Sequence, residues 1–146
     1  MGLKQRRKSK KALRFSKSLK LTWEDAHDIS ERLKKIVLAV EMDWVDPSRV
    51  YCYRSNNSKA RAYARIWGFS RIWQQALDKP PLYIIEVLAE KFDNLSDEKK
   101  DYVLLHELAH IPKNFSGALV PHTRRGKNNF HDKLKKMANT YKSIKK

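Results

Sequence analysis

Residues 103–112 constrain the fold of this 146-residue chain more than any other segment. They read Val-Leu-Leu-His-Glu-Leu-Ala-His-Ile-Pro, so two histidines and a glutamate lie among large apolar side chains. Ser96 is a suitable N-cap and Pro112 cannot occupy a helix interior, which predicts a helix from Ser96 to about His110. Because this helix is apolar on nearly every side, we expect it to be buried. Burying imidazole and carboxylate groups without partners is costly, so these polar side chains need a partner inside the protein.

The three polar residues, His106, Glu107 and His110, form a His-Glu-x-x-His pattern. Residues four apart in an α-helix are separated by about 6 Å along the axis and 40° around it, so both imidazoles can meet one cation. We therefore expect His106 and His110 to bind one Zn²⁺ per chain. Such an ion lowers the pKa of water to about 7, and Glu107 can take the released proton and deliver it to a leaving amine. The pattern predicts a zinc-dependent metallopeptidase whose substrates are proteins or peptides.

A third protein ligand is needed to complete a catalytic zinc site. The metzincin pattern is excluded, because the glycine and histidine that it needs after the second histidine are missing. A glutamate ligand from a later helix is excluded too, because Asp132 is the only acidic residue after Glu107. The candidates are Asp132, His122 at the end of a loop and His131 at the start of the last predicted helix. The residues alone leave these three open.

The rest of the chain alternates short helices and strands. Apolar residues recur at helical spacing from Trp23 to about Val40, with Thr22 as a plausible N-cap. A basic helix with one apolar face is predicted from about Phe130 toward Ile144. Residues 72–77 are compatible with either a helical turn or a strand. Short strands are predicted at residues 49–54, 62–67 and 82–88. These elements predict an α+β fold.

Positive charge is concentrated at the two ends of the chain. The net charge is +16, yet residues 21–112 hold 13 basic and 15 acidic residues. Residues 1–20 hold nine basic residues and no acidic one, and residues 113–146 hold ten basic residues and one acidic one. We expect residues 1–20 to be a disordered basic tail and residues 21–146 to form one domain. Basic ends neutralise phosphates without sequence specificity, which makes nucleic acid a candidate partner. The candidate contacts are Lys4, Arg6, Arg7, Lys8, Lys10, Lys11, Arg124 and Arg125.

The sequence also indicates a compartment. No apolar run approaches the roughly 20 residues that span a bilayer, and residues 1–20 contain no secretory signal. Cys52, the single cysteine, cannot form an intramolecular disulfide. We therefore expect a cytoplasmic protein without membrane association. The sequence makes no prediction about the oligomeric state.

Several segments together resemble a known family. They are residues 58–68 (Ser-Lys-Ala-Arg-Ala-Tyr-Ala-Arg-Ile-Trp-Gly), 83–86, 90–92, 106–112, 115–117 and 121–122. These segments look like archaeal predicted metallopeptidases, akin to phage metallopeptidase domains and more distantly to SprT-like zinc proteases. The resemblance covers residues 45–125 and implies a minimal zincin-like core, in which a short antiparallel sheet of about three strands packs on the motif helix. It favours His122 as the third metal ligand, with His131 as the runner-up.

Two classes of function are consistent with these features. The first is the zinc metallopeptidase, with residues 82–88 as an exposed edge strand that binds an extended peptide. The second is a non-enzymatic nucleic-acid-binding protein whose metal ion only stabilises the fold. Among the remaining polar residues, Arg65 is expected to pair with Glu86 or Glu90, and Tyr83 is expected to pack in the core.

Overall fold

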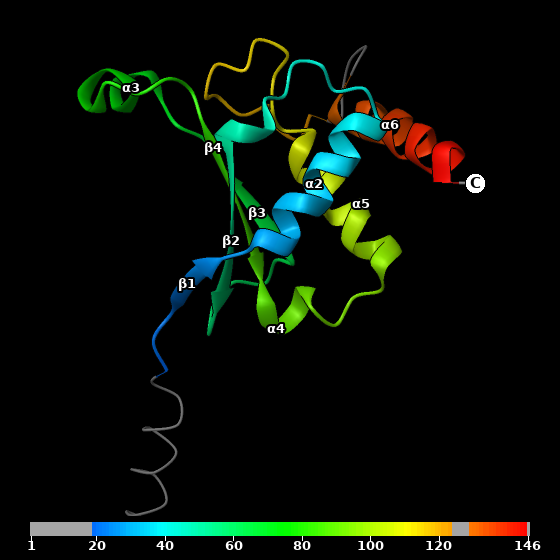
Figure 1. Ribbon diagram of the computed structural model, residues 1–146, viewed down its shortest axis with the longest axis horizontal. Helices are drawn as coiled ribbons and strands as arrows, with labels where there is room; N and C mark the ends of the chain where they lie inside the picture. The colour runs from blue at the N-terminus through cyan, green and yellow to red at the C-terminus, as the bar shows by residue number, and fades with distance from the viewer. Residues whose placement is uncertain (1–18, 124–128, 146) are drawn as a thin grey trace, which may run out of the picture.

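The computed structural model describes residues 19–123 and 129–145 (Figure 1). One sheet with helices packed against it forms an α+β fold, which confirms the predicted fold class. All but the last two residues of the predicted tail, residues 1–20, lie outside the described residues. The candidate nucleic-acid contacts also lie outside them, namely Lys4, Arg6, Arg7, Lys8, Lys10, Lys11, Arg124 and Arg125.

The sheet has four strands in the order β1, β2, β4, β3. Their bounds are β1 Thr22–Asp25, β2 Val50–Asn56, β3 Ala64–Trp67 and β4 Tyr83–Leu88. β4 runs parallel to β2, whereas the β1–β2 and β3–β4 pairs are antiparallel. The sheet is therefore mixed, and the expectation of about three antiparallel strands is wrong in this respect. β4 carries the fully buried Tyr83, Ile85 and Val87, and such an apolar strand is stable in the middle of a sheet.

This strand order also corrects the prediction of the exposed edge. The sequence predicts an edge strand at residues 82–88, but β4 is hydrogen-bonded on both sides, to β2 and to β3. The two edge strands of the sheet are β1 and β3. An extended peptide can therefore add only to one of these two.

The helices agree with the sequence prediction in most places. They are α2 His27–Ala39, η1 Pro47–Arg49, α3 Arg71–Leu77, α4 Ala89–Phe92, α5 Asp97–Leu108 and α6 Phe130–Lys145. The Ser96 hydroxyl accepts a hydrogen bond from the Lys99 N–H and caps α5, as predicted. α2 begins at His27 instead of Trp23, because the chain from Thr22 onward pairs with β2 as a strand. No helix among the described residues combines the length and the apolar character needed to cross a membrane.

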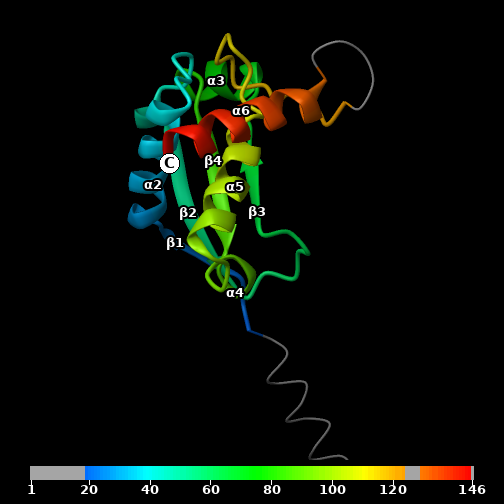
Figure 2. The same cartoon turned by 90° about the vertical axis from the view of Figure 1, so that its right-hand side faces the viewer.

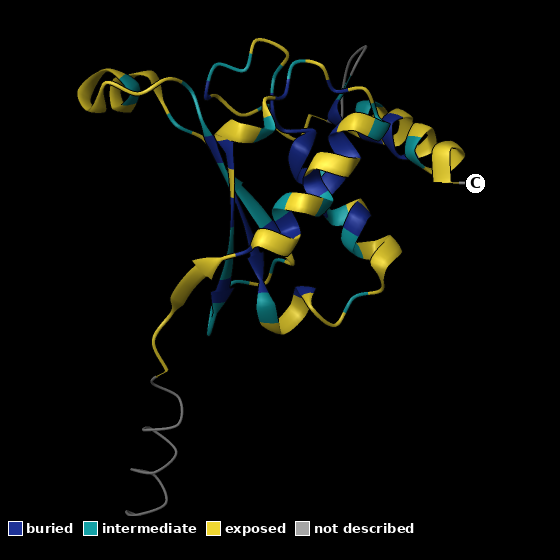
Figure 3. Ribbon diagram, viewed as in Figure 1, coloured by how far each residue is buried: buried dark blue, intermediate teal, exposed yellow. Residues whose placement is uncertain are grey.

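The helices divide unequally between the two faces of the sheet. α2, α5 and α6 lie on one side, whereas α3 projects on the other, and Figure 2 shows the same division from the helical side. Figure 3 shows that the buried residues gather between the sheet and these three helices. Leu33 of α2, Ile85 of β4 and Leu104 of α5 belong to this core and are at most 1% exposed. The core therefore holds α5, and with it the histidine motif, firmly against the sheet.

A buried carboxylate joins the three core helices. Asp101 of α5 accepts hydrogen bonds from Arg32 of α2, at 2.7 Å, and from Tyr141 and Lys145 of α6, at 2.6 and 2.7 Å. Burial alone would raise the pKa of Asp101, but these hydrogen bonds outweigh it and lower the pKa below its ordinary value. Asp101 thereby fixes α5 relative to α2 and α6.

Candidate metal centre

Three histidine side chains converge at the C-terminal end of α5. His106 lies on its last turn, His110 follows shortly after the helix, and His122 lies on the loop that comes next. One ring nitrogen from each lies within 4.8 Å of those from the other two, and the Nε2 atoms of His106 and His122 are 2.9 Å apart. Phe130 of α6 packs against all three rings, with centroid distances of 4.4 to 5.2 Å. The structure thus brings together the predicted histidine pair and the favoured third candidate.

The donor set and its spacing fit a zinc ion. Nitrogens that bind one tetrahedral Zn²⁺ at about 2.0–2.1 Å lie about 3.3 Å apart, close to the separation of His106 and His122. The Nδ1 atom of His110 is 2.6 Å from the Val120 carbonyl oxygen, which it reaches by donating its proton. That hydrogen bond fixes the tautomer that leaves Nε2 free to bind a metal. Imidazole nitrogens are donors that zinc accepts readily.

The surroundings keep two of these imidazoles uncharged. Burial lowers the pKa of His106 to about 4, and the neighbouring His110 and His122 add to the effect. Burial also lowers the pKa of His110, and this outweighs its hydrogen bond to Val120. Both rings are therefore neutral at pH 7, the form that binds a metal ion.

Glu107 lies outside the histidine cluster and faces the sheet edge. Its carboxylate accepts a hydrogen bond from the backbone N–H of Ile66 in β3, and its side chain is nearly buried, with the residue 8% exposed. Burial raises its pKa to about 7, because the hydrogen bond from Ile66 only partly offsets the loss of hydration. A carboxylate with a pKa near neutrality is suited to both accepting and releasing a proton.

The buried Tyr83 of β4 holds the loop that carries His122 against the core. The Tyr83 hydroxyl is 2.9 Å from the Gly117 N–H, which donates to it, and 2.8 Å from the Ala118 carbonyl, to which it donates. A third bond joins the Val120 N–H to the His110 carbonyl at 2.7 Å. The predicted core position of Tyr83 is confirmed, but its hydroxyl holds the loop, a role that the sequence did not reveal.

Gly117 is required in this loop for two reasons. Its φ of +91° favours glycine, and a Cβ atom there would lie 2.1 Å from the Phe69 carbonyl oxygen. The close approach lets the Phe69 N–H donate to the Gly117 carbonyl at 2.8 Å. Gln74 of α3 donates to both Phe69 and Ser116 from the same side. The Ser-Gly pair in the loop was the one sequence signal for this turn.

The other predicted site residues lie apart from the cluster. His131, the runner-up ligand, is exposed on the first turn of α6 and does not join the three histidines, and Asp132 is exposed beside it. Arg65 pairs with Glu86, as predicted, at 2.8 Å. Phe130 was missed, because nothing in a lone phenylalanine near the start of a basic helix indicates contact with three histidines.

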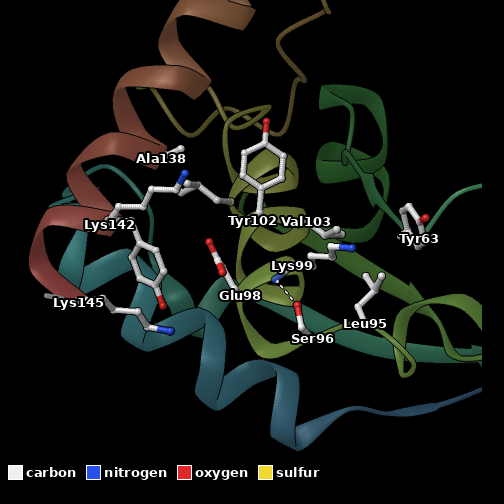
Figure 4. Close-up of a pocket in the computed structure, with 12 residues that line it drawn as sticks. Tyr63, Leu95, Ser96, Glu98, Lys99, Tyr102, Val103, Ala138, Lys142 and Lys145 are labelled. Atoms are coloured by element: carbon white, nitrogen blue, oxygen red, sulfur yellow. Dashed lines mark hydrogen bonds between the residues drawn. The ribbon is translucent and has the colours of Figure 1, made fainter.

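A cavity of about 900 Å³ lies along α5 and does not contain the histidine cluster (Figure 4). Tyr102 and Val103 line it from α5, one helical turn before His106. Tyr63, just before β3, lines another part of it, and Lys99 and Lys142 stand around it. The cavity thus lies along α5, with the C-terminal half of α6 on one side and Tyr63, just before the edge strand β3, on the other.

These features define a small α+β protein with a three-histidine candidate metal site at the end of a core helix. A family profile described as putative phage metallopeptidase matches residues 21–143, and the chain belongs to this family. No curated protein and no solved structure matches the chain. Family membership indicates a metallopeptidase, a metal ion and a protein or peptide substrate.

Proposed function

We propose that this protein is a zinc-dependent metallopeptidase in which His106, His110 and His122 hold the metal ion and Glu107 is the general base and acid. The convergence of three imidazole nitrogens within 4.8 Å, at the end of a buried helix, carries the proposal. Membership of a metallopeptidase family supports it independently. The nearby Glu107, with its pKa raised to about 7 by burial, supplies the proton-transfer group.

Each residue of the site has a defined part in the proposed reaction. A zinc ion held by His106, His110 and His122 would supply Lewis acidity for the scissile carbonyl and for a water molecule. Glu107 takes one proton from that water as its oxygen attacks the carbonyl carbon. As the C–N bond breaks, Glu107 delivers the same proton to the departing amine nitrogen, so the carboxylate is regenerated. His110 is kept in its metal-binding tautomer by the Val120 carbonyl, and Phe130 packs against the imidazole rings and supports their positions.

The substrate is expected to lie along β3, the sheet edge beside the motif helix. The hydrogen bond that the Ile66 N–H donates to Glu107 supports this placement, because it brings β3 next to the carboxylate proposed as general base. An extended peptide added to β3 would pass close to the histidines. The adjacent cavity would receive one of its side chains, and its tyrosines and lysines favour an aromatic or acidic one.

Cleavage of a peptide library of mixed sequence tests this function, because no single substrate has to be chosen. The zinc-loaded wild type should cut a set of the peptides, detected by mass spectrometry, and a chelator should stop the cleavage. Glu107→Gln should retain zinc and lose at least about 100-fold in rate. Glu31→Gln is the matched control, because Glu31 is an exposed glutamate on α2 that lines neither the cavity nor the histidine cluster. Equal rates for wild type and Glu107→Gln would refute the proposed mechanism.

The same variant separates the peptidase from the second class of function. A non-enzymatic protein with a structural metal ion would keep its melting temperature and any nucleic-acid affinity in Glu107→Gln, and would unfold when the metal is removed. It would also leave the peptide library intact. The basic ends are the feature that favours this second class.

A further inference from the structure

Helix α3 presents its apolar side to solvent. It stands at the outer end of β3 and β4, away from the three core helices (Figure 1), and none of its residues is buried. Successive helical residues are about 100° apart, so its four apolar residues share one side, about 140° wide. They are Ile72, Trp73, Ala76 and Leu77, and we call them the α3 stripe. Ile72 is 72% exposed and Trp73 is 59% exposed. A helix normally turns such a stripe toward the core, so its exposure indicates a binding surface.

The polar side of α3 is fastened to the loop that carries His122. The Gln74 amide donates hydrogen bonds to the Phe69 carbonyl at 2.8 Å and to the Ser116 carbonyl at 2.9 Å. The Phe69 N–H also donates to the Gly117 carbonyl at 2.8 Å. These bonds hold α3 beside the candidate metal centre and leave the α3 stripe open to solvent.

A second cavity, of about 490 Å³, lies where these segments meet. Gly68 and Phe69, which continue the chain of the edge strand β3, line it, and residues 116–119 of the loop after α5 line it as well. Trp73 of the α3 stripe and the exposed Leu119 give it apolar walls. A pocket of about 300–1,000 Å³ accommodates a small organic group, so a large side chain fits. The α3 stripe therefore continues into a pocket that the edge strand and the loop of the third histidine also line.

The strand β3 relates this second cavity to the candidate metal centre. The Ile66 N–H reaches Glu107, which marks the strand position beside the proposed scissile bond. Gly68 and Ser70, both in the lining, come two and four residues later, and an extended chain advances about 3.3 Å per residue. A peptide paired with β3 therefore brings a residue about two to four positions from the scissile bond to this cavity. The cavity along α5 is lined by Tyr63, before the other end of β3, so the two cavities take different residues of the substrate.

We propose that the α3 stripe and the second cavity form a substrate subsite that selects a large aliphatic or aromatic side chain. This inference rests on the proposed peptidase function and names its substrate class, extended segments with a large apolar residue about two to four positions from the scissile bond. The occupant is the substrate, because the cavity is continuous with the edge strand and with the loop that carries His122. Binding removes the apolar surface of Trp73 and Leu119 from water together with that of the bound side chain.

Cleavage sites in a peptide library of mixed sequence test the subsite. The zinc-loaded wild type should cut peptides in which large apolar residues are enriched at one fixed position, within about four residues of the scissile bond. In Trp73→Ala, the ratio of kcat/KM between a peptide with leucine at that position and one with glycine should fall at least about tenfold, as expected for loss of an apolar pocket contact. Leu38→Ala should keep the wild-type ratio and is the control, because Leu38 is an exposed apolar residue on α2 that lines neither cavity.

A binding measurement separates this inference from the peptidase proposal. Zinc-loaded Glu107→Gln, applied to an array of immobilised peptides of mixed sequence, should bind peptides enriched in large apolar residues. The enrichment should disappear when Trp73→Ala is added to the same protein. Enriched binding without any cleavage by the wild type would refute the peptidase and leave peptide binding by the α3 stripe standing. Cleavage without an apolar preference at a fixed position would overturn the subsite, as would the absence of any peptide binding by Glu107→Gln.

Two other occupants of the subsite would give different results. Arg71 also lines the second cavity, so a preference for aspartate or glutamate that is lost in Arg71→Gln would overturn the proposal in favour of an acidic side chain. A dimer in solution that dissociates in Trp73→Ala, with an unchanged ratio between leucine and glycine peptides, would overturn it in favour of a contact between two copies of the chain. Light scattering coupled to size-exclusion chromatography measures this dissociation.

Discussion

Tyr83→Phe should separate loop positioning from metal chemistry, because it removes one oxygen atom and leaves the ring in place. Tyr83 is 0% exposed, and its hydroxyl holds both Gly117 and Ala118. Without the hydroxyl, the buried Gly117 N–H has lost this partner, whereas the exposed Ala118 carbonyl can bond to water. One orphaned buried donor costs about 1–3 kcal/mol of unfolding free energy. The contact of the ring with Phe115, at 5.0 Å, is retained.

The consequence for the metal follows from the place of Gly117 in the His122 loop. A loop that is held less firmly positions His122 less well, and loss of outer contacts around metal ligands typically weakens binding about 10- to 100-fold. We expect about a tenfold loss of zinc affinity, measured by competition with a chromophoric chelator. Urea unfolding of the metal-free protein measures the stability term separately. Tyr102→Phe is the control, because the Tyr102 side chain is exposed on α5. Zinc affinity within about twofold of the wild type, together with unchanged stability, would refute the positioning role of Tyr83.

Two further substitutions test buried carboxylates. Burial raises the pKa of Glu107 to about 7 from its ordinary value of 4.5, so its contribution to stability is present below pH 4.5 and is lost as the pH rises through 7. In metal-free protein, the unfolding free energy of Glu107→Gln minus that of the wild type should therefore increase by about 3 kcal/mol between about pH 4 and pH 8. Urea unfolding of both proteins at each pH measures this difference. A difference that does not change with pH would contradict burial as the cause of the raised pKa. Glu86→Gln should lower the unfolding free energy by about 2 kcal/mol, because it removes the charge of the buried Glu86 from its pair with the partly exposed Arg65 and turns an amide N–H toward the indole donors. A loss below about 1 kcal/mol would contradict that account.

The sequence predicted those parts of the fold that depend on local pattern. Helix α5, with its Ser96 cap and its end before Pro112, follows from signals within a few residues of each other. The pairing of His106 with His110 follows from helical geometry alone. Strand β4 was recognised from its β-branched residues, but its central place in the sheet depends on β2 and β3, which the local pattern does not report.

Trp23 shows why the prediction failed at the start of α2. Its spacing from Ala26 and Ile29 fits a helix, and both of those residues are buried as predicted. Trp23 itself lies on β1, where its indole N–H reaches Glu86, a residue 63 positions later in the chain. A long-range hydrogen bond and strand pairing together override helical spacing here, and neither is visible in a local window.

The third histidine of the cluster, His122, was among the predicted candidates, but local pattern did not select it. The residues alone leave His122, His131 and Asp132 open, since the spacing along a loop does not reveal where it turns. The structure folds that loop back through Gly117, held by Tyr83, and leaves His131 exposed on α6. The resemblance to phage metallopeptidases favours His122, and the described geometry brings the same residue to the cluster.

Metal content of the purified protein tests the central claim most directly. Wild type and His131→Ala, prepared without chelator and analysed by plasma mass spectrometry, should each contain one zinc ion per chain. His122→Ala should contain little, because the remaining histidine pair binds zinc much more weakly than three ligands do. Wild-type protein without a stoichiometric transition metal, or His122→Ala with a full complement of zinc, would contradict the proposed centre.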